Sequence, residues 1–278
     1  MVTQTLTEAS TSRYADANGF KIHYNEAGSG HPVIFIHGGG PGASGWSNFV
    51  RNIGPMSERY RVLLVDMPGF GKSDPIVIGT ETDRLRENAR IFVDFLDAMG
   101  IDKASFVGNS MGGGTSAVIA INHPERVEKL VLMGAAGGGK SLFNPLPMEG
   151  IKALRDVYVK QTKESFREMI DLFVYDSSFV TEELLEQRVA GLLEHPEHID
   201  GQRRSNPMLP DLTMELGKIK APSLVVWGRD DLFVPLDHAL KFMWHIPNAR
   251  LHVFPRCGHW AQYEHADGFN RLLLEFLG

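Results

Sequence analysis

The chain has 278 residues, of which 43% are hydrophobic and 22% are charged, as in an ordinary globular protein with a large core. Its net charge of −6 offers no basic footprint for nucleic acid, and no stretch is long and apolar enough to cross a membrane. The only cysteine, Cys257, excludes an internal disulfide framework and suits a reducing compartment. We expect Cys257 to have only a packing role, as a small, semi-buried and unreactive side chain.

The first half of the sequence alternates between predicted strands and helices. Residues 1–16 lack the basic and apolar parts of a signal peptide, so we expect a loose tail on a cytoplasmic protein. Residues 13–26 are predicted to form a hairpin around Asn18-Gly19. Continuous apolar runs and helical periodicity then predict strands at 32–36 and 61–66, a helix at 86–99, a strand at 104–107, a helix at 111–122 and a strand at 129–133.

Residues 136–213 interrupt this alternation. They contain no apolar strand run and carry helical patterns at 149–160, 163–174 and 181–193. The alternation then resumes with a strand at 223–227, a helix at 236–245, a strand at 251–254 and a helix at 264–277. We therefore predict an α/β fold with a mostly parallel, doubly wound sheet built from residues 1–135 and 214–278, and a helical lid, residues 136–213, inserted after the sixth strand.

The motif Gly108-Asn109-Ser110-Met111-Gly112 lies between a predicted strand and a predicted helix. Strand, Gly-x-Ser-x-Gly and helix make up the nucleophile elbow, a sharp turn that exposes the serine Oγ at a helix N-terminus. Backbone N–H groups and the helix dipole favour developing negative charge at that place. A simple strand-to-helix turn is the alternative, and the flanking elements favour the catalytic interpretation.

A serine nucleophile needs a base, and in this arrangement the base follows late in the chain. His259 comes just after the 251–254 strand and just before the last helix, so it is the predicted base. His37 opens a glycine loop, and we expect a structural role for it, as for His265. The remaining candidates have no such placement and are expected to be surface or satisfied core residues: His123, His195, His198, His238 and His245.

Two adjacent aspartates, Asp230 and Asp231, follow the 223–227 strand, where the orienting acid belongs. The usual spacing of four residues to Pro235 selects Asp231. Asp230 is then expected to face elsewhere and to pair with Arg229 or a loop amide.

A glycine loop, residues 37–42, follows the first buried strand, where an oxyanion hole needs its donor loop. Glycine allows the backbone to approach a substrate carbonyl without a Cβ in the way. Gly39 or Gly40 is expected to supply one N–H, with Gly39 favoured, and Met111 the other.

With these residues in place, the chain resembles the meta-cleavage product hydrolases of the α/β-hydrolase superfamily from about residue 20 to the end. The resemblance is carried by HGGGPGASGWSNF, DMPGFGKSD, VGNSMGG, PMEGIK, TEELLEQR, WGRDDLFVPLDHALK and CGHWAQYEHADGFNRL. It implies an α/β-hydrolase fold and hydrolysis of a carbon–carbon bond in aromatic ring-fission products, as in biphenyl degradation. It implies no metal or organic cofactor, a small-molecule substrate, and a dimer or larger homo-oligomer.

Arg188 lies on the apolar stripe of the 181–193 pattern with Leu184, Leu185 and Leu192. An inward arginine needs an anionic partner, although periodicity alone equally allows the side chain to reach solvent. The resemblance assigns Arg188 to the substrate carboxylate. By the same matching, Asn48, Asn109 and Trp260 would donate hydrogen bonds around a dienoate, and the apolar end of the substrate would be walled by Phe173, Phe233 and Leu154.

Several rival functions remain open at the level of sequence. A proline iminopeptidase shares the glycine loop, but we find no acidic residues placed for a substrate amine. A carboxylesterase shares the triad and has no need of Arg188, and a ligand-sensing receptor can share the whole fold. The sequence decides neither the preferred acyl group nor whether Ser110 attacks the substrate itself or assists water.

Overall fold

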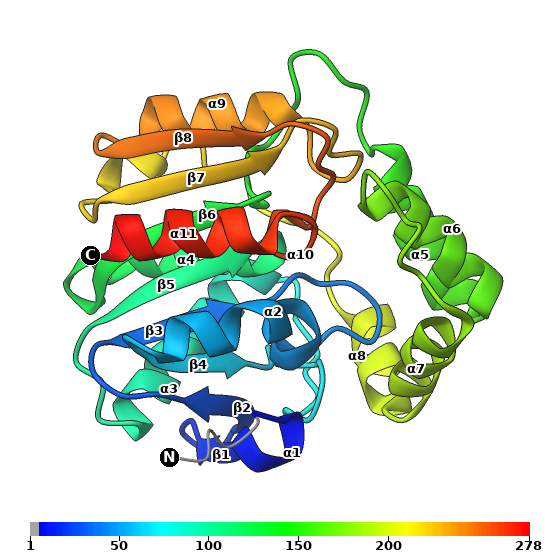
Figure 1. Cartoon of the computed structure of the whole chain (residues 1–278), viewed down its shortest axis with the longest axis horizontal. Helices are drawn as coiled ribbons and strands as arrows, with labels where there is room; N and C mark the ends of the chain where they lie inside the picture. Colours follow the sequence, from blue (N-terminus) through cyan, green and yellow to red (C-terminus); the bar gives the residue numbers. More distant parts are fainter. Residues whose placement is uncertain (1–5) are drawn as a thin grey trace.

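An eight-stranded sheet runs through the part of the protein that the computed structural model describes, residues 6–278 (Figure 1). Its strand order is β1-β2-β4-β3-β5-β6-β7-β8. The pairs β1–β2 and β2–β4 are antiparallel, and the other neighbours are parallel. The strands are β1 Ser12–Asp16, β2 Lys21–Ala27, β3 Pro32–Ile36, β4 Arg61–Val65, β5 Ala104–Asn109, β6 Val127–Met133, β7 Ser223–Gly228 and β8 Ala249–Phe254.

Helices cover both faces of this sheet because its central strands are apolar on both sides. In β3, Ile34 and Ile36 pack into the core beneath α3, α4 and α9, whereas Val33 and Phe35 pack into the core beneath α2 and α11. The predicted doubly wound sheet is therefore confirmed. The helices concerned are α2 Gly45–Ser57, α3 Arg84–Ala98, α4 Met111–Asn122, α9 Leu236–His245, α10 Ala261–Glu264 and α11 Ala266–Leu277.

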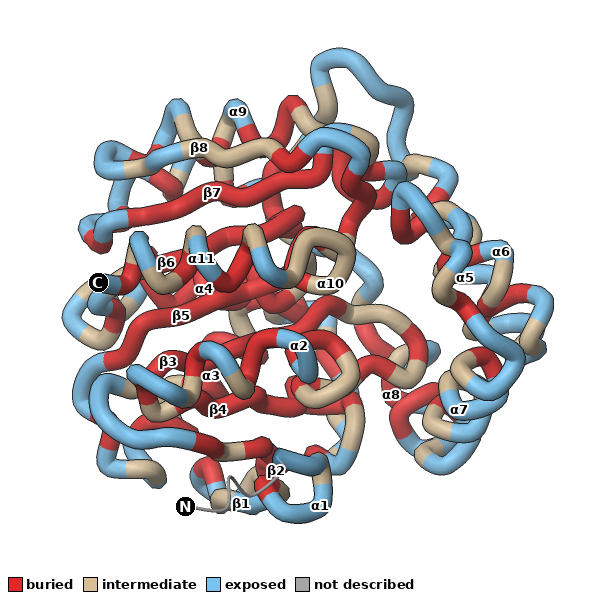
Figure 2. The backbone as a smooth tube through the Cα atoms, in the orientation of Figure 1, coloured by how far each residue is buried: buried red, intermediate tan, exposed pale blue. Residues whose placement is uncertain are grey.

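Four helices between β6 and β7 form a separate layer beyond the carboxyl ends of the parallel strands (Figure 1). They are α5 Glu149–Lys160, α6 Lys163–Phe173, α7 Glu182–Leu193 and α8 Pro196–Arg204. The α6 helix begins at a capping box between Thr162 and Ser165 and buries Phe166, Met169 and Ile170. The outer surfaces of these helices are largely exposed (Figure 2). The layer thus covers the sheet edge where a nucleophile elbow opens.

The N-terminal segment differs from its predicted form. Thr7 and Ser10 form a capping box that starts α1, Glu8–Thr11, and β1 pairs with β2 along its whole length. The described part of the expected loose tail is therefore ordered; its first five residues lie outside the described range. The predicted turn is confirmed, since Asn18 and Gly19 both have positive φ, as a two-residue hairpin requires.

Three further helical features were not predicted from periodicity. The α2 helix contains Gly45 and Pro55 and is kinked at Phe49, so its pattern is irregular. The α8 helix is short and polar and begins with Pro196. The expected helix 264–277 is divided at His265 into α10 and α11. In the described chain, no helix has both the length and the apolar character to cross a membrane.

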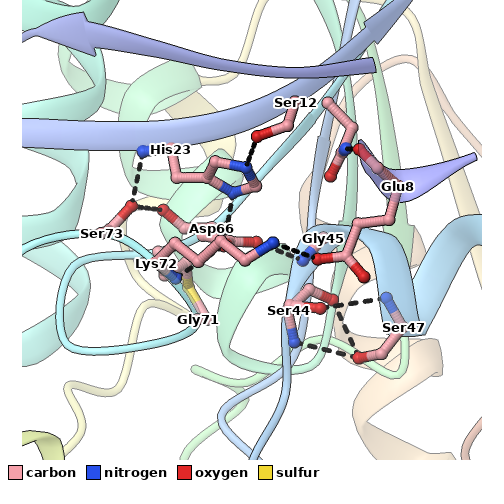
Figure 3. A network of polar contacts seen from close by, with 12 residues as sticks. Glu8, Ser12, His23, Ser44, Gly45, Ser47, Asp66, Gly71, Lys72 and Ser73 are labelled. Atoms are coloured by element: carbon pink, nitrogen blue, oxygen red, sulfur yellow. Dashed lines mark hydrogen bonds and ion pairs between the residues drawn. The ribbon is translucent and has the colours of Figure 1, made fainter. Parts of the chain in front are cut away.

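A buried polar network joins the antiparallel end of the sheet to the start of α2 (Figure 3). The His23 Nδ1–H donates to Asp66 Oδ2 at 2.8 Å, and the hydroxyl of Ser12 donates to His23 Nε2 at 2.8 Å. Asp66 also accepts from the backbone N–H groups of Gly45 at 2.7 Å and Lys72 at 2.9 Å. This single carboxylate therefore fixes both the 66–73 loop and the first turn of α2.

Candidate active site

Ser110 lies at the turn between β5 and α4 with φ 54° and ψ −117°, a conformation that a non-glycine residue adopts only under strain. Its flanking glycines are required by sterics. A Cβ on Gly108 would clash with the Gly112 carbonyl, and one on Gly112 would clash with the Ile36 carbonyl. The Ser110 N–H donates to Met133 O at 2.8 Å, which secures the turn to β6. The geometry is that of a nucleophile elbow.

Asp231 and His259 form a buried pair behind this turn. The His259 Nδ1–H donates to Asp231 Oδ2 at 2.7 Å, and both side chains are no more than 1% exposed. The other carboxylate oxygen accepts from the N–H groups of Phe233 at 2.7 Å and Val234 at 2.9 Å. This arrangement fixes the ring so that Nε2 carries the lone pair, as a general base requires.

His259 Nε2 is buried and has no hydrogen-bond partner among the described residues, Ser110 Oγ included. In ligand-free sites such contacts are often long and tighten only when substrate binds. The free nitrogen is therefore available to accept the serine proton.

Asp230 does not bond to the imidazole of His259, as we expected if Asp231 is the acid that orients this ring. It pairs with Arg229 at 3.2 Å and accepts weakly from the Cys257 N–H at 3.4 Å. Cys257 itself is fully buried rather than semi-buried, and burial raises the pKa of its thiol. The thiol is therefore held in its unreactive protonated form.

The loop that carries His259 depends on a carboxylate that the sequence did not single out. Glu264 accepts from the N–H groups of Gly258 at 3.0 Å and Trp260 at 3.3 Å. On the other side, the His259 N–H donates to the Phe173 carbonyl at 2.7 Å. This last bond joins the lid directly to the loop of the predicted base.

The glycine loop after β3 lies beside the first turn of α4. Gly39 packs so closely on Met111 that a Cβ would clash with the Met111 side chain, whereas Gly40 has open space at its Cβ position. No acceptor of the described chain binds the N–H of Gly39 or Gly40, and the Met111 N–H is unpaired within its helix, as first-turn N–H groups are. His37 anchors the loop by accepting from the Met67 N–H at 2.9 Å and donating to Gly38 O at 2.7 Å. Its predicted structural role is thus confirmed.

A cavity of about 240 Å³ lies between this loop and the lid, and its lining is mostly apolar. It contains seven of the predicted substrate-site or nucleophile side chains: Asn48, Ser110, Leu154, Phe173, Arg188, Phe233 and Trp260. The ring centroids of Phe173 and Phe233 are 3.9 Å apart, and those of Phe173 and Trp260 are 4.6 Å apart. One end of the cavity therefore offers an aromatic wall.

Arg188 reaches this cavity from α7 rather than extending to solvent. Its guanidinium donates to Ser47 Oγ at 3.2 Å and lies 5.6 Å from the centre of the Trp260 ring. Burial lowers its pKa, and none of the carboxylates in the described chain pairs with it. A partly buried cation in an apolar cavity without a counter-charge is costly, so the site is complementary to an anion.

The two asparagines differ in their placement. Asn48 lines the cavity, with its amide donating to Ser44 O at 3.2 Å. Asn109 is fully buried and does not line the cavity, contrary to our expectation. Its amide nitrogen is already used by the carbonyls of Met133 at 3.3 Å and His259 at 3.5 Å. Asn109 thus connects the elbow to the loop of the predicted base.

Arg155 and Ser47 were missed by the sequence reasoning. Arg155 lies on α5, is exposed, and lines the cavity beside Leu154. Nothing in the periodicity separates it from an ordinary surface arginine. Ser47 could have been noticed, because Ser44-x-x-Ser47 forms the capping box that begins α2.

Most of the sequence matches the model of a known protein family. The family model described as "Alpha/beta hydrolase family" covers residues 33–272, and the chain belongs to this family.

Comparisons over the full length of the chain with known relatives and solved structures identify a narrower group within the α/β-hydrolase family. The chain is 51% identical to a 2-hydroxy-6-oxo-6-phenylhexa-2,4-dienoate hydrolase of Burkholderia cepacia, over 98% of each chain. It is 49% identical to a 2-hydroxy-6-oxononadienedioate/2-hydroxy-6-oxononatrienedioate hydrolase of Comamonas testosteroni, again over 98% of each. A solved meta-cleavage product hydrolase from Pseudomonas fluorescens IP01 superposes with a TM-score of 0.84 at 33% identity, covering 97% of this chain and 98% of that one. The protein is thus an enzyme, one of the meta-cleavage product hydrolases.

Proposed function

We propose that the protein hydrolyses the carbon–carbon bond of 2-hydroxy-6-oxo-6-aryl-hexa-2,4-dienoates. The products would be 2-hydroxypenta-2,4-dienoate and a carboxylic acid such as benzoate. One observation carries the proposal: the uncompensated Arg188 lies in an apolar cavity that also contains Ser110 and an aromatic wall. The phenyl substrate in the name of the Burkholderia relative supports the same assignment.

In the proposed mechanism the dienol is first converted to its keto form, so that the leaving fragment becomes a stabilised carbon acid. Ser110 then attacks the C6 carbonyl while His259 Nε2 takes its proton, and Asp231 holds the imidazolium in place. Breaking the bond between C5 and C6 releases the dienoate fragment, which takes up a proton. Water then attacks the acyl-serine, with His259 again as base, and releases the carboxylic acid.

Developing negative charge on the C6 oxygen would be stabilised by the N–H groups of Met111 and of Gly39 or Gly40. Preorganised donors of this kind each contribute about 3–4 kcal/mol in comparable sites. The unpaired state of the loop amides supports this role. An attack by water assisted by Ser110 would use the same donors.

The two ends of the substrate would be held by different chemistry. Arg188 would bind the dienoate carboxylate, with Asn48 and Trp260 donating to the neighbouring oxygens. Phe173, Phe233 and Leu154 would wall the aryl group. We assign Asn109 to positioning, because its amide already connects the elbow and the His259 loop.

A second candidate substrate class is favoured by Arg155. Its exposed guanidinium lines the cavity, and a substrate whose acyl fragment ends in a carboxylate would find a cation there. The Comamonas relative is named for such a dioate. No comparable observation favours the activity of a carboxylesterase or a proline iminopeptidase, or the role of a ligand-sensing receptor.

We also propose residues 136–213 as the lid domain over a core of residues 1–135 and 214–278. The enzyme would act in the cytoplasm in the catabolism of aromatic hydrocarbons, as a dimer or larger homo-oligomer. It would need no cofactor, because His259 would transfer the protons and the backbone amides would stabilise the negative charge that the hydrolysis develops.

A spectrophotometric panel tests the proposal. Purified protein is mixed with the 6-phenyl dienoate, the nonadienedioate and a neutral aryl ester, and loss of the dienoate absorbance is followed. We expect the phenyl compound to be cleaved with the highest kcat/KM, and labelled water to enter the carboxylic acid product. No turnover of any 2-hydroxy-6-oxohexa-2,4-dienoate, together with brisk ester or peptide hydrolysis, would overturn it. A preference for the nonadienedioate would select the second candidate.

A further inference from the structure

Three potential metal ligands cluster at the start of α8, where His195 is the N-cap residue and Glu197 and His198 lie in the first turn. His195, Glu197 and His198 each place one ligand atom within 4.8 Å of the others. His195 Nδ1 and Glu197 Oε1 are 3.0 Å apart, and the rings of the two histidines stack at 5.0 Å. Neighbouring ligands of a tetrahedral ion with bonds near 2.0 Å are about 3.3 Å apart, so small side-chain rotations would close this set.

His198 is not the satisfied core histidine that its sequence context suggested. It is 9% exposed, and its Nε2 lies 3.2 Å from the Gly71 carbonyl, to which it donates. That bond leaves a lone pair on Nδ1, which is buried and has no partner in the described chain. A backbone carbonyl that fixes the ring in this way is the usual support of a metal-binding histidine.

The cluster opens on a small cavity of about 20 Å³, separate from the Ser110 cavity. Both imidazoles line it, together with Gly42 and Gly71 of two core loops. That volume is enough for one water-sized occupant. No lysine or arginine of the described residues forms an ion pair with Glu197, so its charge is available.

The geometry points to a divalent-metal site at His195, Glu197 and His198, selective for zinc-like ions. Two imidazole nitrogens and one carboxylate oxygen suit Zn²⁺, Cu²⁺ or Ni²⁺ and disfavour Mg²⁺ or Ca²⁺, which prefer oxygen ligands. Three protein ligands leave a fourth position for water. The site takes no part in the proposed hydrolysis and does not depend on it.

Occupancy would act on the lid. The turn begins after α7, the helix that carries Arg188, and His198 already joins it to the 66–73 loop. A metal held by these three neighbouring residues would rigidify the start of α8 and hold His198 in the orientation that bonds to the Gly71 carbonyl of the core. Metal binding to the folded state adds to the free energy of unfolding, so the melting temperature should rise with metal concentration.

The test is isothermal titration of the full chain with Zn²⁺ after chelator treatment and removal of the chelator. We expect one site per chain outside the triad, and tetrahedral absorption bands when Co²⁺ replaces Zn²⁺. His195→Ala and Glu197→Gln should each weaken binding by at least about tenfold, because ligands contribute more than their supporting residues do. Neither residue has a bond to the core that its loss would break, and circular dichroism checks the fold.

Two control variants locate the site. His123→Ala removes an exposed histidine with an acidic neighbour at 3.6 Å and should leave zinc binding unchanged. His259→Ala removes the predicted base and should also keep the site. Unchanged binding in His195→Ala and Glu197→Gln would overturn the proposal, as would its loss in His259→Ala alone. Absence of zinc binding to the unaltered chain would overturn it as well.

Discussion

Among the described residues, two serines lie near a buried histidine–aspartate pair, and only one of these arrangements is built like a reaction centre. In the first, His23 bonds to Asp66 at 2.8 Å and to Ser12 at 2.8 Å (Figure 3). In the second, His259 bonds to Asp231 at 2.7 Å and leaves its Nε2 free beside the cavity. By hydrogen bonds alone, the Ser12 set is the more complete triad.

The surroundings separate the two sets. Ser12 lies on a β-strand, away from the large cavity, whereas Ser110 lines that cavity at the N-terminus of α4. Asp66 also binds two backbone N–H groups of neighbouring segments, so its task is to fix loops. A triad is therefore recognised by what lies beyond the serine, namely a cavity and oxyanion donors, more than by its internal distances.

The largest expected effect comes from the serines. Ser110→Ala should lower turnover of the preferred dienoate by about 10⁴-fold or more, because a nucleophile is lost. Ser12→Ala should leave kcat within about twofold of the unaltered enzyme, since no substrate reaches it. Steady-state kinetics on both variants measures this difference in kcat. Near-normal turnover by Ser110→Ala would show that the centre lies elsewhere.

The two adjacent aspartates give the next effect. Asp231→Asn should reduce turnover by about 10³-fold, because the imidazole loses the carboxylate that fixes its tautomer. Asp230→Asn is the matched control, and we expect less than about threefold loss, since it removes a surface pair with Arg229 and weakens a long hydrogen bond from the Cys257 N–H. The reverse ranking in kcat would contradict the assignment of Asp231.

Arg188→Gln should cost about 2–3 kcal/mol of transition-state stabilisation on dienoates, roughly 10²-fold in kcat/KM. A neutral aryl ester has no carboxylate to hold, so its hydrolysis should be nearly unaffected. Parallel kcat/KM measurements on both substrates distinguish binding from support of the lid. Equal losses would mean that Arg188 has only a structural role.

The smallest effect on catalysis, with a clear effect on stability, is expected for Asp66→Asn. The folded protein should lose about 2 kcal/mol in urea unfolding at pH 7, while kcat per folded molecule stays unchanged. Burial raises the pKa of Asp66, but the hydrogen bond and charge of His23 outweigh it and hold that pKa below its ordinary value.

The sign of the pH dependence follows from this lowered pKa. The stabilisation from Asp66 is present above the ordinary carboxyl pKa of about 3.9 and is lost as the pH falls through the folded value. Unfolding free energies measured between pH 7 and pH 3 should therefore fall less steeply in Asp66→Asn than in the unaltered protein. An unchanged pH profile would contradict this account of the network.

Much of the fold could be predicted because parallel strands that are buried on both faces appear in the sequence as continuous apolar runs, such as 32–36 and 129–133. The pairing of Asp231 with His259 and the elbow at Ser110 could be predicted, because these residues follow strand ends in a fixed order along the chain. The network of Ser12, His23 and Asp66 could not be predicted from the sequence. Its residues span 54 positions and come together only because their strands are neighbours in the sheet.

Asn109 shows a second limit. It adjoins Ser110, and a family pattern places it beside the substrate, but the orientation of its amide depends on the carbonyls of Met133 and His259. The latter lies 150 positions away. Orientation of a single side chain at the end of a strand is decided by such distant partners, which no local pattern contains.

The lid leaves the sheet after β6 and returns at β7, and these strands are direct neighbours, with Leu130 opposite Ser223. Its exit and entry points are therefore side by side, and no strand register depends on what lies between them. The length of this segment can therefore vary without shifting the sheet, provided that the Phe173 carbonyl keeps its hydrogen bond to the His259 N–H. The cavity is lined from both sides, by Leu154, Phe173 and Arg188 of this segment and by Ser110, Phe233 and Trp260 of the core, so a change in the segment reshapes one wall and leaves the other in place.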